Sequence, residues 1–251
     1  MRIRIVSGLM ITAVLSLAGC GGQGGQAAVL ITTPVEGVTA GDVTINVDVT
    51  DFDIAGKGNP EAGHIIYYID TPVPVYYDHL AISGAGTYAV SDKLSHTWSG
   101  VTPGEHTFSA QLVKGDNTPL PSPVVNTVKL HVAPPKGDPK LSISLPKSGD
   151  SLTPGPVYIG VMTKNFILSG AHIGATNRTG EGHLIYYIDE EPPVDPGAPA
   201  LTETSVVSVK TDHIWRDVKA GTHTLYVQLV NNDDTPLKTP VVASVTVEVA
   251  P

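Results

Sequence analysis

The chain has 251 residues, a net charge of −9 and a single cysteine. An acidic surface repels the phosphate backbone of nucleic acids and the headgroups of anionic lipids, so we expect no nucleic-acid partner and no basic membrane-binding face. One cysteine excludes a disulfide within the chain, so the fold must be stabilised by its core.

The N-terminus has the features of an export signal. Arg2 and Arg4 precede an apolar stretch from Ile5 to Leu17, and small residues then lead to Cys20. This stretch is too short for a transmembrane helix, which needs about 20 residues, and the pattern is typical of a signal peptide. It resembles a bacterial lipoprotein signal. The resemblance implies that the chain is cleaved before Cys20 and that Cys20 carries the lipid.

The lipoprotein resemblance also implies a location. Residues 1–19 would be the signal peptide, and residues 20–27 would be the lipidated cysteine with a flexible Gly/Gln tether. Gly21 follows the cysteine where an Asp would favour the inner membrane of a two-membrane cell. We therefore expect an exported protein, attached to the membrane through its lipid anchor, at the outer membrane or the cell surface.

The rest of the chain consists of two copies of one module. Residues 96–134 align without a gap on residues 213–251, and twenty of the 39 positions are identical. Upstream, the segment from Gly63 to Asp70 matches the segment from Gly182 to Asp189 at all but one position. We predict a first domain at 28–134, a linker at 135–139 and a second domain at 140–251, because indels between copies fall where loops tolerate them.

Each module shows about seven strand-like segments separated by turn residues. Gly, Pro and β-branched residues are plentiful and long helical patterns are missing, which favours an all-β chain. Phe108, Ala110 and Leu112 alternate on one face of a strand, as Val128, Leu130 and Val132 do on the last strand of the module. The fold class predicted is two tandem immunoglobulin-like Greek-key β-sandwiches. In the first module, the expected strands are Ala28–Thr32, Thr44–Val49, His64–Asp70, Thr87–Ser91, Ser95–Trp98, His106–Val113 and Val124–Val132.

Both modules resemble the bacterial Ig-like domains of secreted and surface proteins. The resemblance is carried by a Tyr-Tyr-Ile-Asp segment, then a tryptophan, then a Gly-x-His-Thr strand, and it implies a fold but no particular function. The repeated positions are Tyr67, Tyr68, Asp70, Trp98, His106, Asp116 and Pro119 in the first module and Tyr186, Tyr187, Asp189, Trp215, His223, Asp233 and Pro236 in the second.

Histidines are the candidate metal ligands. His64, His96, His183 and His213 could form two sites for copper or zinc if each pair converged with a further ligand. We expect His64 and His96 to begin strands at one end of the sandwich and His106 to lie at the other end, bonded to backbone. The alternative is that the four histidines bond strand ends or pack beside Trp98 and Trp215; otherwise no cofactor is expected.

Two kinds of loop could have either a structural or a binding role. Asp116 to Leu120 and Asp233 to Leu237 read as turns in which Asp bonds its own backbone. Tyr76 and Tyr77 lie in a proline-containing loop, have no match in the second module, and could form an exposed aromatic patch.

The sequence carries none of the common catalytic signatures, so we expect no enzyme. The leading hypothesis is a lipid-anchored envelope protein, structural or binding, that presents two modules to a protein or glycan. The alternatives are a copper- or zinc-handling protein and an accessory subunit of an envelope complex.

Overall fold

The computed structural model describes residues 25–54, 62–82 and 86–251. The predicted signal peptide and Cys20 lie outside these ranges. Within them, no helix is long and apolar enough to cross a membrane.

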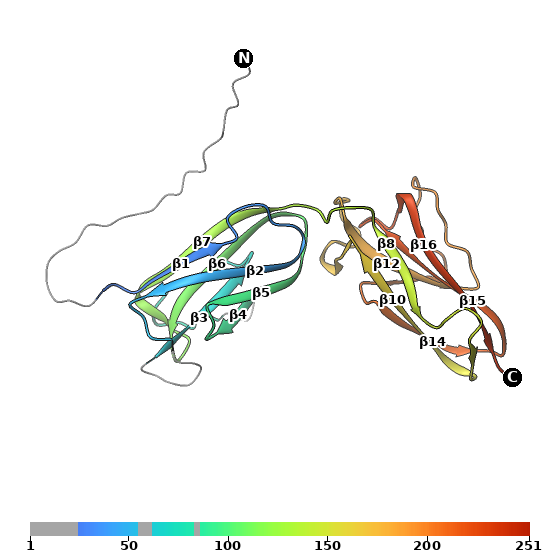
Figure 1. The fold of residues 1–251 in the computed structure, drawn as a ribbon, viewed down its shortest axis with the longest axis horizontal. Helices are drawn as coiled ribbons and strands as arrows, with labels where there is room; N and C mark the ends of the chain where they lie inside the picture. The colour runs from blue at the N-terminus through green and yellow to red at the C-terminus, as the bar shows by residue number, and fades with distance from the viewer. Residues whose placement is uncertain (1–24, 55–61, 83–85) are drawn as a thin grey trace, which may run out of the picture.

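The strands fall into two successive sets, each wrapped around its own core (Figure 1). We call residues 28–134 the first half and residues 140–251 the second half. The strands of the first half are β1 (Ala28–Thr33), β2 (Gly41–Thr50), β3 (Gly63–Ile69), β4 (Thr87–Ser91), β5 (Ser95–Val101), β6 (Gly104–Lys114) and β7 (Pro119–Val132). The elements of the second half are β8 (Lys140–Leu145), β9 (Ser151–Leu152), β10 (Gly155–Lys164), β11 (Ile167–Leu168), the 3-10 turn η1 (Gly170–His172), β12 (Glu181–Ile188), β13 (Val206–Ser208), β14 (Asp212–Val218), β15 (Gly221–Val230) and β16 (Pro236–Val249).

The first half is a sandwich of two antiparallel sheets. One sheet has the order β1-β2-β5 and the other the order β4-β3-β6-β7, so the chain crosses between layers after β2, β4 and β5. The second half repeats both layers as β8-β10-β14 and β13-β12-β15-β16, with the short strands β11 and β9 added in parallel at the edges. The predicted all-β Greek-key sandwich is confirmed.

The core of each half lies between its two sheets. In the first half, Phe108, Ala110 and Leu112 of β6 are fully buried there, and Leu130 and Val132 of β7 join them. The alternation predicted from the sequence is therefore confirmed. Tyr67 and its equivalent Tyr186 are also fully buried, and their hydroxyls donate to the backbone oxygens of Lys93 and Lys210. The second core also contains Ile159, Phe166, Leu184, Leu225 and Leu229.

The turns between the last two strands of each half differ slightly from the prediction. Asp116 accepts from the backbone N–H of Thr118 at 2.9 Å, and Asp233 does the same for Thr235 at 3.1 Å. Pro119 and Pro236, however, are the first residues of β7 and β16 and do not belong to the turns. A proline fits the first position of a strand because its missing N–H is not needed there.

Candidate functional site

His64 and His183 are buried at the starts of equivalent strands. Nε2 of His64 lies 2.9 Å from Oδ1 of Asn117, and Nε2 of His183 lies 2.8 Å from Oδ1 of Asp234. Burial lowers the pKa of His183, and the Asp234 carboxylate partly opposes that shift. Each ring thus connects the start of its own strand, β3 or β12, to the turn that follows the neighbouring strand, β6 or β15.

His96 and His213 occupy a different place from the one expected. β5 begins opposite the middle of β2, where His96 pairs with Ile45, so His96 does not share an end of the sandwich with His64. Its ring stacks on Tyr67 with centroids 5.5 Å apart and meets the edge of Trp98 at 4.5 Å. The ring of His213 is tilted by 34° from that of Tyr186, with centroids 5.4 Å apart, and lies nearly perpendicular to that of Trp215, with centroids 4.6 Å apart.

The four candidate metal ligands therefore each have a protein partner of another kind. In the part of the chain that the structure describes, no group of three or more His, Cys, Asp or Glu side chains could hold a metal ion. Burial lowers the pKa of both His96 and His213, because desolvation favours the neutral form of an imidazole.

His106 bonds Asp70, which lies 36 residues earlier in the chain, and His223 bonds Asp189, which lies 34 residues earlier. We call each His–Asp pair a clamp. Nδ1–H of His223 donates to Oδ2 of Asp189 at 2.6 Å, and Nε2–H donates to the backbone oxygen of Lys219 at 2.9 Å. The other Asp189 oxygen accepts from the N–H of Thr224. His106 makes the corresponding bonds to Asp70 and to the Thr102 backbone, at the opposite end of β3 from His64. Because a carbonyl and a carboxylate both accept, the ring must donate from both nitrogens.

This clamp gives a pH-dependent contribution to stability. The hydrogen bond to Asp189 raises the pKa of His223 above 6.5. A raised folded-state pKa stabilises the protein below the unfolded pKa, and that contribution is lost as pH rises through the folded value. An NMR titration is expected to place the His223 pKa above 6.5 and that of His213 below it, with Asp189→Asn lowering only the former. A His223 pKa at or below 6.5 would contradict the clamp.

The β3–β4 connection holds the exposed tyrosines on a fixed support. Gln111, fully buried on β6, donates from Nε2 to the backbone oxygen of Pro74 at 2.8 Å. The Tyr68 hydroxyl shares its proton between Gln111 Oε1 at 2.7 Å and the backbone oxygen of Ala81 at 2.8 Å. The Ala81 N–H in turn donates to the oxygen of Asn117. Both ends of segment 74–81 are thereby bonded to the sheet.

The second half builds the same support. Gln228 donates to the oxygen of Pro193 at 3.0 Å, and the Tyr187 hydroxyl lies 2.9 Å from Gln228 and 2.7 Å from the oxygen of Ala200. The N–H of Ala200 donates to the backbone oxygen of Asp234, as the N–H of Ala81 donates to the backbone oxygen of Asn117. The sequence pattern did not reveal Gln111 and Gln228 as support residues, although they are identical in the two copies.

Replacing the supporting glutamine of one half is expected to lower the unfolding free energy of that half only. Gln111→Leu has nearly the same shape but leaves the Pro74 oxygen without its donor, which costs about 1–3 kcal/mol. The urea midpoint of the first half, followed at Trp98, is expected to fall, and Gln228→Leu is expected to do the same at Trp215. Unchanged midpoints in both variants would show that the bonds do not hold the loops.

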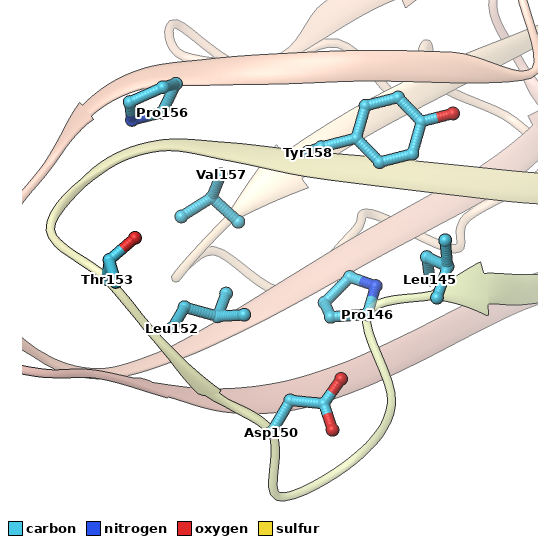
Figure 2. Close-up of a pocket in the computed structure, with 8 residues that line it drawn as sticks. All are labelled: Leu145, Pro146, Asp150, Leu152, Thr153, Pro156, Val157 and Tyr158. Atoms are coloured by element: carbon cyan, nitrogen blue, oxygen red, sulfur yellow. The ribbon is translucent and has the colours of Figure 1, made fainter.

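A shallow pocket of about 290 Å³ lies in the second half (Figure 2). Asp150 is the charged residue in its lining, and its carboxylate already accepts from the N–H of Lys147 at 2.7 Å. Leu145 and Tyr158 also line the pocket and are half-exposed. The pocket offers no paired acid and base for catalysis.

Comparison with known proteins shows no family, and the fold rests on the strand order described above. No family model matches the chain, and no curated protein matches it. The fold is an immunoglobulin-like β-sandwich, built twice. Similar solved structures include fibronectin(III)-like modules of Clostridium thermocellum CbhA, at 16% identity and a TM-score of 0.27 over 88% of this chain and 94% of that one.

Two further solved structures are equally distant. The Ig1-Ig2 domains of Dpr2 in complex with DIP-Theta match at 13% identity and a TM-score of 0.25, over 88% of this chain and 98% of that one. The N-terminal domains of the bacteriophage RB49 Hoc capsid protein match at 12% and 0.23, over 90% and 71%. Nothing about function follows from likenesses at this level.

Proposed function

We propose that the protein is a lipid-anchored, non-catalytic binding protein of the bacterial cell envelope. Cys20 carries the lipid, at the outer membrane or the cell surface, and the two sandwiches extend into the envelope from that anchor. One observation carries the binding role: the first half presents Tyr76 and Tyr77 to solvent from a loop whose ends are bonded to the sheet beneath. Rigid, exposed aromatic side chains are the contact residues that binding proteins favour.

The non-catalytic part of the proposal is supported by how the ionisable side chains are used. The six histidines that the repeat pairs bond turn residues and backbone or pack on aromatic rings, and the Asp70 and Asp189 carboxylates close loops. A site for chemistry needs an acid, base or nucleophile aimed into a cavity. The copper or zinc alternative lacks converging ligands in the described residues.

The anchor is tested by Cys20→Ser. In the producing bacterium, the unaltered protein is expected to fractionate with membranes and to incorporate labelled palmitate. The variant is expected to lose the label, because the acylated sulfur is gone. Palmitate labelling that survives in Cys20→Ser would exclude the proposed anchor.

The binding role is tested by cosedimentation of a fragment of residues 27–251, which lacks Cys20 and so cannot be held by the lipid, with washed envelopes of the same bacterium. The unaltered fragment is expected to sediment with the envelopes. The same fragment with Tyr76→Asp and Tyr77→Pro is expected to stay in the supernatant. Equal sedimentation of both proteins would contradict the assignment of binding to this loop.

A further inference from the structure

The aromatic loop, residues 75–80, displays apolar and polar groups side by side. Tyr76 is 72% exposed and Tyr77 is 61% exposed, although large apolar rings are normally covered. Nδ1 of His79 lies 2.7 Å from the Asp78 carboxylate, and the His79 ring meets Tyr76 edge-on at 6.1 Å. Two rings, a carboxylate and an imidazole therefore share one small exposed surface.

The second half provides an internal comparison for this loop. Residues 194–199 lie between Pro193 and Ala200, which are bonded to the sheet as Pro74 and Ala81 are in the first half. The N–H of Ala198 donates to the backbone oxygen of Asp195 at 3.2 Å, and the N–H of His79 donates to that of Tyr76 at 3.1 Å. The backbone turn is thus the same, while Asp195 and Pro196 stand in place of the two tyrosines. The fold does not require aromatic residues there, so the tyrosines are present for something other than the fold.

We propose that the aromatic loop is a binding site for a neutral polysaccharide of the envelope or its surroundings. This inference rests on the proposed binding function and names its ligand. A sugar ring has an apolar C–H face that packs on an aromatic ring and hydroxyls around its edge that hydrogen-bond. The Tyr76 and Tyr77 rings supply the first kind of contact, and their hydroxyls, Asp78 and His79 supply the second.

Size and charge distinguish this ligand from the alternatives. A stable protein interface buries about 800 Å² on each partner with about 20–30 residues, whereas the aromatic loop presents six. An acidic polymer would be repelled by the net charge of −9 and by the Asp78 carboxylate, whose pKa the hydrogen bond with His79 lowers. A neutral sugar chain needs only a few stacked rings and has no charge to oppose.

The test is calorimetric titration of the detergent-solubilised full protein with neutral hexasaccharides, namely cellohexaose, chitohexaose and maltohexaose. At least one is expected to bind, and Tyr76→Asp with Tyr77→Pro is expected to weaken binding about tenfold or more. The variant should fold, because the second half carries Asp-Pro on the same turn, and an unchanged unfolding midpoint at Trp98 verifies this. The matched control, Asp195→Ala with Pro196→Ala, is expected to bind as the unaltered protein does.

The outcomes separate this inference from the proposed function. If no hexasaccharide binds but the fragment of residues 27–251 still sediments with envelopes, and protease treatment of the envelopes abolishes that, the ligand is a protein and the polysaccharide inference is overturned. Sugar binding that the double tyrosine variant leaves unchanged would overturn the location of the site. Absence of both sugar and envelope binding would overturn the proposed function as well.

Discussion

Tyr186→Ala is expected to destabilise the second half strongly while the first half keeps its stability. Tyr186 is fully buried in the second core, packs against the ring of His213 and donates a hydrogen bond from its hydroxyl to the backbone oxygen of Lys210. Removing a buried aromatic ring costs about 3–5 kcal/mol, a large part of the stability of a domain of this size. The two halves have separate core clusters, so the loss should stay in one of them.

The chain contains one reporter for each half, since Trp98 and Trp215 are its only tryptophans. Urea unfolding of Tyr186→Ala is followed at Trp215 in a Trp98→Phe background and at Trp98 in a Trp215→Phe background. The Trp215 transition is expected to shift or vanish, and the Trp98 transition is expected to stay within about 0.5 kcal/mol of its control. Parallel loss of both transitions would show that the halves unfold as one unit and would contradict two independent domains.

Gly182→Ala is expected to be nearly as damaging as the loss of the ring. A Cβ at Gly182 would lie 2.0 Å from the backbone oxygen of Val230, and one at the equivalent Gly63 would lie 2.1 Å from that of Val113. Backbone atoms cannot turn aside as a flexible side chain can, so the strands β12 and β15 must separate locally. We expect a cost of about 3 kcal/mol, in the upper part of the range for overpacking.

Gly170→Ala is the matched control for this substitution. Its Cβ would meet Val209 at 3.7 Å, an ordinary contact, and Gly170 is exposed. Its unfolding midpoint at Trp215 is expected to stay close to that of the unaltered protein. If Gly182→Ala is tolerated as well as Gly170→Ala, the close approach of the two strands is not a constraint on the sequence.

The sheet architecture was predictable because it follows from local patterns. Alternation at Phe108, Ala110 and Leu112 identifies an inward face from three residues of one strand. The repeat then transfers each strand to the other half. The start of β5 at Ser95 was predicted correctly, but the level at which β5 pairs with β2 was not predictable, because it depends on pairing and not on local pattern. His96 was expected at the same end of the sandwich as His64 and lies instead against Tyr67 and Trp98, where the alternative interpretation placed it.

Of the candidate site, only the exposed tyrosines were predictable from the sequence. Tyr76 and Tyr77 stand out in the sequence because the second copy lacks them. The bonds that hold their loop join Gln111 to Pro74 across 37 positions, and the clamp joins His106 to Asp70 across 36. Contacts between residues this far apart have no periodic signature. Comparing the two copies position by position, however, would have indicated Gln111 and Gln228.

Exchange of the two loops tests most directly the claim that one support is present twice and that the tyrosine pair makes it a binding site. The chain to examine replaces Tyr76, Tyr77, Asp78 and His79 by Asp, Pro, Gly and Ala, and replaces Asp195, Pro196, Gly197 and Ala198 by Tyr, Tyr, Asp and His, so that the hydrogen-bonding groups move with the rings. Its affinity for the hexasaccharide that the unaltered protein binds is measured beside that of the double variant lacking both tyrosines. We expect the exchanged chain to bind within about threefold of the unaltered protein, because the ring contacts move to an equivalent turn. An exchanged chain that is folded at both Trp98 and Trp215 yet binds no better than the tyrosine-less variant would contradict the account.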